Sequence, residues 1–275
     1  MVYGVLRFIN FAHSDVFMVG AFTGFYLAPQ VNKSLPAQSF LSGAVVLLGA
    51  MAVCCVLGIV IERLAYRPLR KRPTLTVLIT AIGVSLLLQN LGQFVFGANP
   101  KSFPKLYAQT NFNLPGRVVI SSDQIAVLAI ALLLMIALQY IVLKTKIGTA
   151  MRAVSFNPVA ASLVGINIDR VVSFTFGLGS ALAGAGGILY ALNYPSIDPL
   201  MGTLPGLKAF VAAVLGGIGN IPGAALGGMV IGIVETFVAG TAWSTYRDAI
   251  AFAVLILILL FKPAGLLGKL QVEKV

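Results

Sequence analysis

Eight apolar segments, separated by polar or turn-rich stretches, follow one another along the chain. They cover roughly residues 11–28, 40–61, 75–97, 124–143, 171–192, 204–219, 223–242 and 246–262. An apolar run of about 18 residues or more is typical of a transmembrane helix, because about 20 helical residues cross a hydrocarbon core of about 30 Å. The runs are continuous instead of alternating, which argues against a β-barrel. The pattern therefore predicts an all-α, polytopic membrane protein, with residues 1–275 forming a single transmembrane domain.

The positively charged residues between these segments predict the orientation of the chain. Lys and Arg number five in 62–73, four in 144–170 and three in the tail from 262, twelve in all. The loops between them, at 29–39, 98–123, 193–203 and 243–248, hold five in total. Because short basic loops stay in the cytoplasm, we expect the first three stretches, with the C-terminus, to be cytoplasmic. The net charge of +11 then reflects topology and not nucleic-acid binding.

The N-terminal residues do not form a complete spanning helix. The stretch "MVYGVLRFINFAHSD" precedes or overlaps the first apolar segment and lacks the charged and apolar regions of a signal peptide. We expect it to be the end of a helix whose beginning is missing.

A mixed, mildly basic module lies between two apolar segments, at "AMRAVSFNPVAASLVGINIDR" (150–170). Asn157 suits an N-cap, Pro158 suits the first helical position, and Gly165 suits a helix end. The stretch predicts two short helices, at about 149–155 and 158–164. A surface of this kind is typical of docking into a groove on a soluble partner. The alternative is an ordinary cytoplasmic linker on the membrane surface, and spacing alone does not separate the two.

Glycine is dense in two of the apolar segments, at 177–187 and 215–228. Gly219, Gly223 and Gly227 lie four residues apart, a spacing that lets helix backbones approach closely in lipid. We therefore predict helix-packing faces. The glycines do not form a nucleotide-binding motif, so any ATP would be hydrolysed by another chain.

Ionisable and amide residues also lie in or near the apolar segments. Asn10, His13 and Asp15 are close to the first segment, Lys208 begins another, and Glu235 is near the middle of a third. Because such groups are costly in a bilayer, they usually face the protein interior or a wet cavity, and they are candidates to line a path for a zwitterionic solute. Alternatively, Lys208 extends to the interface and Glu235 bonds to a neighbouring helix.

The sequence holds no catalytic constellation. The two cysteines, Cys54 and Cys55, are adjacent in an apolar run, and His13 is the only histidine. Neither a metal-ligand pattern nor a catalytic triad follows from these residues. We expect a protein without catalytic residues, metal or cofactor.

Three stretches resemble the branched-chain amino acid ABC transporter permeases, on the LivH side of the LivH/LivM pair. They are "INFAHSDVFMVGAF" (9–22), "MRAVSFNPVAASLVGINIDRV" (151–171) and "LKAFVAAVLGGIGNIPGAALGGMVIGIVE" (207–235). The resemblance covers nearly the whole chain, and the last two stretches are specific in combination. It implies a full helix before the first stretch, so this chain resembles an N-terminally truncated member.

The resemblance implies a role for the module at about 144–170. In such permeases the corresponding stretch is the coupling loop, whose short helices sit in a cleft of the ATP-binding subunit. It assigns ATPase coupling to Arg152, Asn157, Ala161 and Gly165. Family members often carry an acidic residue where this chain has Asn157, a change that preserves helix capping but not a charge contact.

The resemblance also implies partners and a mechanism. The partners are a second, LivM-like permease subunit, two cytoplasmic ATP-binding subunits and an extracytoplasmic solute-binding protein, with no nucleic acid. Branched-chain amino acids would cross the bacterial inner membrane by alternating access. Urea or short-chain amides are alternative solutes in the same family. An ion-coupled secondary transporter or channel is a different class, but it would leave the cytoplasmic module unexplained, and a non-transporting scaffold is the third alternative.

Overall fold

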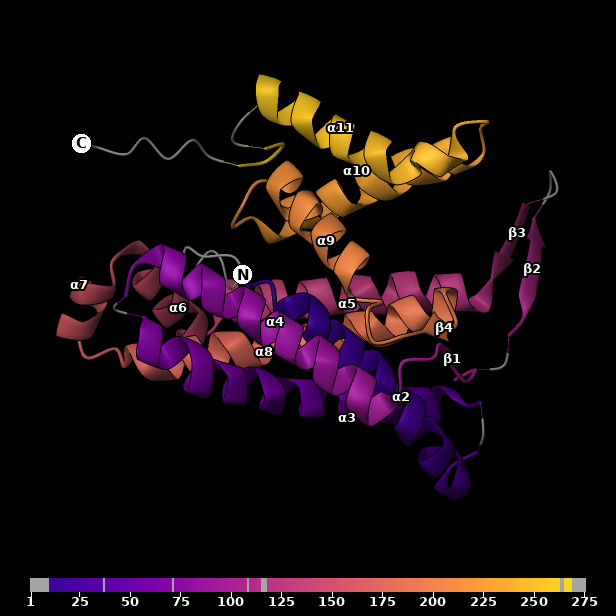
Figure 1. The fold of residues 1–275 in the computed structure, drawn as a ribbon, viewed down its shortest axis with the longest axis horizontal. Coiled ribbons are helices and arrows are strands. Elements are labelled where there is room, and N and C mark those ends of the chain that lie inside the picture. Colours follow the sequence, from indigo (N-terminus) through magenta and orange to yellow (C-terminus); the bar gives the residue numbers. More distant parts are fainter. Residues whose placement is uncertain are drawn as a thin grey trace. The chain divides into compact units, whose positions relative to one another are not determined.

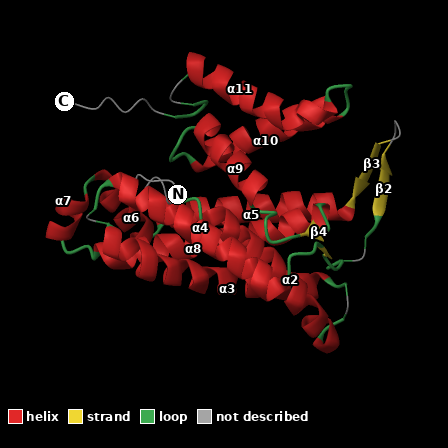
Figure 2. Cartoon of the chain, in the orientation of Figure 1, coloured by secondary structure: helices red, strands yellow, loops and turns green. Residues whose placement is uncertain are grey.

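A computed structural model describes residues 10–36, 38–70, 72–107, 109–114, 118–262 and 265–268, and it is mostly helical (Figure 2). Residues 1–9 of the expected N-terminal stub lie outside this range. The chain divides into two compact units, essentially Gly4–Thr203 and Leu204–Val275, and each is described by itself.

The first unit contains the long helices α2 to α5 and α8 and the short pair α6 and α7 (Figure 1). Their bounds are α2 His13–Ser34, α3 Phe40–Ile61, α4 Thr74–Phe96, α5 Ser122–Lys144, α6 Lys146–Phe156, α7 Pro158–Leu163 and α8 Ile168–Asn193. A π-helical turn, η1 (Glu62–Tyr66), and a 3₁₀ turn, η2 (Arg67–Leu69), follow α3. In the second unit are α9 (Thr203–Gly216), α10 (Ile221–Ala239), the 3₁₀ turn η3 (Ser244–Tyr246) and α11 (Arg247–Phe261).

A helix occupies each of the eight predicted apolar segments, which confirms the all-α, polytopic class. Within the described residues, five helical stretches are long and apolar enough to cross a membrane: Phe40–Leu69, Leu75–Phe96, Ser122–Lys144, Ile168–Asn193 and Ile221–Ala239. The helix α9 is apolar but shorter. Its 14 residues extend only about 21 Å, less than a hydrocarbon core of about 30 Å.

Helix α8 is the centre of the first unit, and it packs along both α2 and α3. Its small residues allow this close approach. A Cβ atom on Gly20 of α2 would overlap the backbone of Gly184, and one on Gly187 would overlap the Phe17 carbonyl. On the α3 side, a Cβ on Gly58 would overlap Ser180. The glycine-rich stretch 177–187 thus lies at helix–helix contacts, as small residues do in membrane proteins.

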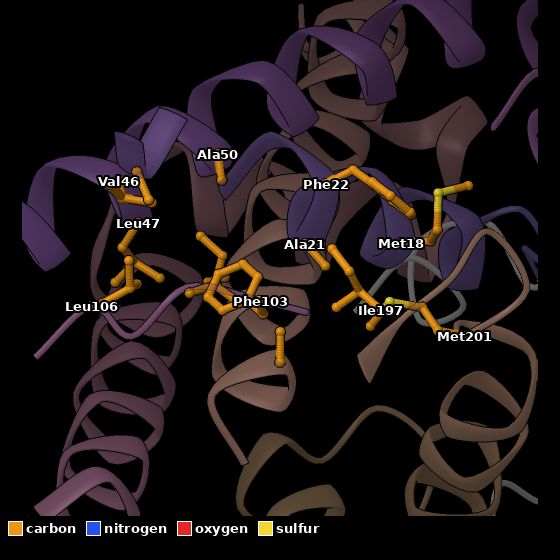
Figure 3. Close-up of a cluster of buried hydrophobic side chains, with 14 residues drawn as sticks. Met18, Ala21, Phe22, Val46, Leu47, Ala50, Phe103, Leu106, Ile197 and Met201 are labelled. Carbon is orange, nitrogen blue, oxygen red and sulfur yellow. The ribbon is translucent and has the colours of Figure 1, made fainter. Parts of the chain in front are cut away.

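The main apolar core joins α2, α3 and α8 to the connecting loops (Figure 3). Met18 and Phe22 of α2 pack with Ile197 and Met201, which come from the loop after α8. Phe103, from the loop after α4, completes the cluster between α2 and α3. The core therefore includes two loops as well as the helices.

Short strands pair two loops that are far apart in sequence. The strand β1 (Lys101–Ser102) pairs antiparallel with β4 (Ser196–Ile197). The stretch 98–123, read from the sequence as a loop, also contains a hairpin of β2 (Asn111–Leu114) and β3 (Val118–Ser121). Because β1 and β4 are hydrogen-bonded, the loops 98–123 and 193–203 lie at the same end of this unit.

Candidate functional site

The module between α5 and α8 is built by local caps. The Thr145 hydroxyl accepts a hydrogen bond from the Gly148 backbone at 3.1 Å and begins α6. The Asn157 side chain accepts from the Ala160 backbone at 3.0 Å and begins α7. Gly165 has a φ of 85° just after α7. These positions follow the capping pattern in the sequence, since an Asx cap satisfies a free backbone N–H and glycine tolerates positive φ.

The four residues expected to couple the ATPase mostly hold this module together. The Arg152 guanidinium donates to the Val142 carbonyl of α5 and lies 3.3 Å from the Thr149 hydroxyl. Ala161 is buried, and its backbone carbonyl accepts from the Ile166 N–H at 3.0 Å. With Asn157 at a cap and Gly165 at a turn, each of the four has a bonding or backbone role within the chain.

The exposed surface of the module includes a group of apolar side chains. Phe156, Leu163 and Val164 have exposed fractions of 87%, 83% and 77%, and Val159 is also exposed. We call these four residues the apolar ridge. The sequence prediction, which named Arg152, Asn157, Ala161 and Gly165, did not include these side chains. The available signal was a phenylalanine, a leucine and two valines in a segment outside the predicted spans.

An ion-pair network joins the basic loop after α3 to the first turns of α8. Glu62, fully buried, bonds to Arg70 and accepts from the Ser173 hydroxyl. Arg70 also donates to Asp169 at 2.7 Å, and Asp169 in turn pairs with Arg67. The segments 62–70 and 168–173 therefore lie at one end of the unit, and α8 begins four residues after Val164 of the ridge.

The second unit contains a three-way ion pair. The Lys208 ammonium of α9 lies 2.8 Å from a Glu235 oxygen of α10 and 2.7 Å from an Asp248 oxygen of α11. Each side chain is at least partly buried. Lys208 thus points toward the two carboxylates, and Glu235 bonds to a neighbouring helix. Asp248 was missed, because its distance from Lys208 along the sequence gives no sign of contact.

The three polar residues near the first segment have separate surroundings. Asn10 accepts a hydrogen bond from the Tyr66 hydroxyl at 2.6 Å. His13 is partly buried in the first turn of α2. Asp15 is buried and accepts from the Gln89 amide of α4 at 3.0 Å. Asn10 and Asp15 therefore have different hydrogen-bond partners.

The glycines expected at a packing face divide into two kinds. Gly223 and Gly227 of α10 lie against Gly216 and Ala212 of α9, where a Cβ would overlap backbone. Gly219 differs from the expectation: it precedes the helix, has a φ of 92° and has open space around its Cβ position. It serves the tight turn between the helices, a position that favours glycine. Among the described residues, no group of three or more His, Cys, Asp or Glu is placed to hold a metal.

Comparisons with known proteins agree over the length of the chain. The family described as "Branched-chain amino acid transport system / permease component" matches residues 1–259. The chain is 39% identical to the LivH high-affinity branched-chain amino acid transport permease of Escherichia coli K12, over 100% of this chain and 90% of that relative. It is 40% identical to the BraD permease of Pseudomonas aeruginosa, over 100% of this chain and 91% of that protein.

A more distant relative is archaeal. The probable LivH permease of Methanocaldococcus jannaschii is 30% identical over 94% of this chain and 82% of its own length. No solved structure matches. Together with the polytopic helical fold, the full-length matches show that this multi-pass membrane protein belongs to the family of branched-chain amino acid transport system permease components.

Proposed function

We propose that this chain is the membrane-spanning permease subunit of an ATP-driven importer for branched-chain amino acids, located in the bacterial inner membrane. The permease names of the relatives support the substrate class. The observation that carries the proposal is the apolar ridge. Large apolar side chains exposed on two capped helices, outside the long apolar segments, favour contact with another protein.

The partner on the ridge is a cytoplasmic ATP-binding subunit, and the module 144–170 is the coupling loop. Phe156, Leu163 and Val164 fill an apolar groove on that subunit, as helix anchors do in peptide recognition. Arg152, Asn157, Ala161 and Gly165 hold the ridge in its shape. The C-terminus and the basic loop 62–73 lie on the same, cytoplasmic side. ATP hydrolysis takes place on the partner, so this chain is not itself an enzyme.

The coupling loop moves the membrane helices through α8. Because α8 begins just after α7 and is tied to the basic loop by Arg67, Arg70 and Asp169, a shift of the ridge is passed to both α8 and α3. Packed helices of this kind shift as bodies between a few states, which is the basis of alternating access.

The remaining partners are a second, LivM-like permease subunit, a second ATP-binding subunit and an extracytoplasmic solute-binding protein. The paired loops that carry β1 and β4 are the surface for the binding protein. A bare face of α10 suits another membrane helix: Gly232 has open space at its Cβ position, and Thr236 and Gly240 follow at four-residue steps.

The substrate pathway is a separate part of the proposal. Of the polar residues Asn10, His13, Asp15 and Glu235, two have bonding partners that account for them: Tyr66 for Asn10 and Lys208 for Glu235. The ion pair of Glu235 supports a role in bonding between helices. Asp15 is the strongest candidate for the pathway, because its carboxylate is buried in the helices and its Oδ2 atom has no hydrogen-bond partner among the described residues.

The test of the proposed function is co-purification and transport. The tagged chain, extracted from membranes with detergent, is expected to bring down an ATP-binding subunit whose vanadate-sensitive activity rises with liganded binding protein. In proteoliposomes the same complex is expected to take up leucine with ATP. ATP-driven uptake of urea but not leucine would assign another solute, and a chain that recovers no ATPase would overturn the proposal.

The ridge itself is tested by changing Phe156→Ser and Leu163→Ser together. Losing two large apolar contacts is expected to reduce recovery of the ATP-binding subunit about tenfold or more, with membrane insertion unchanged. The matched control is Ser162→Ala, an exposed change on α7, which should leave recovery as in the native chain. Undiminished recovery with the double variant would show that the ridge is not the docking surface.

A further inference from the structure

The contacts between α2 and α4, which we call the α2–α4 seam, include one polar pair followed by apolar pairs. The Asp15 carboxylate meets the Gln89 amide at 3.0 Å. One turn further, Met18 lies against Gly92. Another turn on, the rings of Phe22 and Phe96 stack with centroids 4.4 Å apart. The two helices thus run side by side, and their contact changes from charged to apolar within one turn.

The Asp15 carboxylate is only half satisfied. Its side chain is 1% exposed, and Oδ1 accepts from Gln89. Oδ2 is buried and, in the part of the chain that the structure describes, has no hydrogen-bond partner. The Ser85 hydroxyl lies beside the carboxylate and accepts from the Gln89 amide nitrogen at 3.3 Å. A buried acceptor without a donor is costly, and for a charged group the cost is larger.

The carboxylate lies in the first turn of α2, level with the middle of the candidate span that contains α3. The backbone carbonyl of the next residue, Val16, accepts from the Cys54 thiol at 3.5 Å, and Cys54 lies near the middle of the candidate span Phe40–Leu69. An acidic residue within the membrane is rare and usually functional, since it is expensive to keep there. Asp15 is therefore not a residue that reaches the surface to be solvated.

Among the described residues, Oδ2 lacks a donor. A positively charged N–H group bonded to Oδ2 would satisfy both the charge and the hydrogen bond. The missing partner thus has the chemistry of an ammonium group.

We infer that Asp15, positioned by Gln89, receives the ammonium group of the amino-acid substrate as it passes through the permease, with Met18 beside it contacting the apolar side chain of the substrate. This inference rests on the proposed function. The layer of Met18 and Gly92, one turn from the acid, matches a ligand whose charged and apolar ends are only a few bonds apart.

The site is closed in this structure by the loop after α8. Pro199 lies near Gly92, and Gly202 lies so close to the Ser14 carbonyl that a Cβ would overlap it. Figure 3 shows Met201 and Ile197 of the same loop beside Met18. Substrate therefore reaches Asp15 only when this loop and the α2–α4 seam separate, as alternating access requires.

The direct test measures ligand binding to the complete complex of permease and ATP-binding subunits in nanodiscs, without binding protein. The unfolding temperature of the complex is measured with each of three probes. They are leucine, isoamylamine (which lacks the carboxylate) and isocaproate (which lacks the ammonium). Leucine and isoamylamine are expected to stabilise the complex and isocaproate is not. In Asp15→Asn, the concentration of leucine or isoamylamine needed for half of the stabilisation is expected to rise about tenfold to a hundredfold. This is the effect of losing a charged hydrogen bond.

The matched control is Asp123→Asn, the same chemical change in the first turn of α5, which should leave both ligand titrations unchanged. If Asp15→Asn does not accumulate, Gln89→Leu takes its place. This change removes the hydrogen-bond donor to Oδ1 and should also weaken the binding of isoamylamine. If Asp15 had only a structural role, Asp15→Asn would lower the unfolding temperature of the complex without ligand. Its ligand titrations would match those of the native chain.

Equal titrations for the native chain and Asp15→Asn, stabilisation by isocaproate, or no stabilisation by any probe would overturn the inference. Leucine uptake by the native complex in proteoliposomes tests the proposed function separately. Uptake by the native complex together with an unchanged Asp15→Asn titration would reject the ammonium site and leave the permease assignment standing.

Discussion

At the residue scale, the glycines of the first unit differ in what surrounds them. Gly184 of α8 lies against Cys54 and the Ala50 carbonyl of α3, where a Cβ would be 2.7 Å from Sγ. Gly83 of α4 has open space at the same position. The first allows two helix backbones to touch, whereas the second has no atom of the described residues within 4 Å of its Cβ position. Composition alone does not distinguish them, because both lie in apolar helices.

Replacing Gly184 with valine should therefore destabilise the protein, and replacing Gly83 should not. Gly184→Val forces α8 away from α3 and is expected to cost about 1–3 kcal/mol of unfolding free energy, the range for overpacked cores. Gly83→Val makes the same change in helix propensity without the clash. Thermal unfolding of the detergent-purified variants checks this, and equal midpoints would contradict the packing role of Gly184.

At the element scale, the basic loop after α3 is held by α8 through buried charge. Glu62, the first residue of η1 after α3, is fully buried and pairs with Arg70, which in turn pairs with Asp169. Arg63, in the same π-helical turn, is exposed. A buried charge that loses its partner is strongly destabilising, because the desolvation cost remains while the attraction is gone.

Arg70→Met is thus expected to lose about 3 kcal/mol or more of unfolding free energy, and Arg63→Met to lose little. Adding Glu62→Gln to Arg70→Met should restore part of the loss, because the unpaired charge is removed. Unfolding midpoints of the four proteins, native included, measure this. A double variant less stable than Arg70→Met alone would argue against an ion pair as the main interaction.

Some elements were readable from the sequence, and others were not. Asn157 and Pro158 mark the break between α6 and α7, because capping depends on neighbours along the chain. The contact of Asp15 with Gln89 was not readable, since it depends on how α2 and α4 lie together. The ion pair of Lys208 with Asp248 was missed for the same reason, and the hairpin of β2 and β3 lay hidden in a stretch with proline and glycine.

At the scale of the whole molecule, the first unit has two chemically different ends. At one end β1 pairs with β4, and at the other the segment 62–70 is tied to the start of α8. This arrangement agrees with the order of basic and less basic loops along the chain, in which 98–123 and 193–203 share one side and 62–73 and 144–170 share the other.

Labelling with a membrane-impermeant maleimide should separate these ends. In a chain with Cys54 and Cys55 changed to alanine, Gln109→Cys is expected to react in intact cells, and Ser162→Cys only after the membrane is opened. The reason is that basic loops remain in the cytoplasm during insertion. Mass spectrometry of the purified chain reads both sites, and the reverse pattern would invert the proposed topology.

The burial of α8 has a consequence for biogenesis. Of the five candidate spans, Ile168–Asn193 is the least apolar and the most enclosed by protein. A helix rich in glycine and small residues gains little from contact with lipid alone, and its stability comes from the backbones it touches. Those backbones, α2 and α3, are synthesised earlier. The helices that α8 packs against are therefore already in place when α8 leaves the ribosome. In a chain that lacks α2 or α3, we expect α8 to insert into the bilayer less stably.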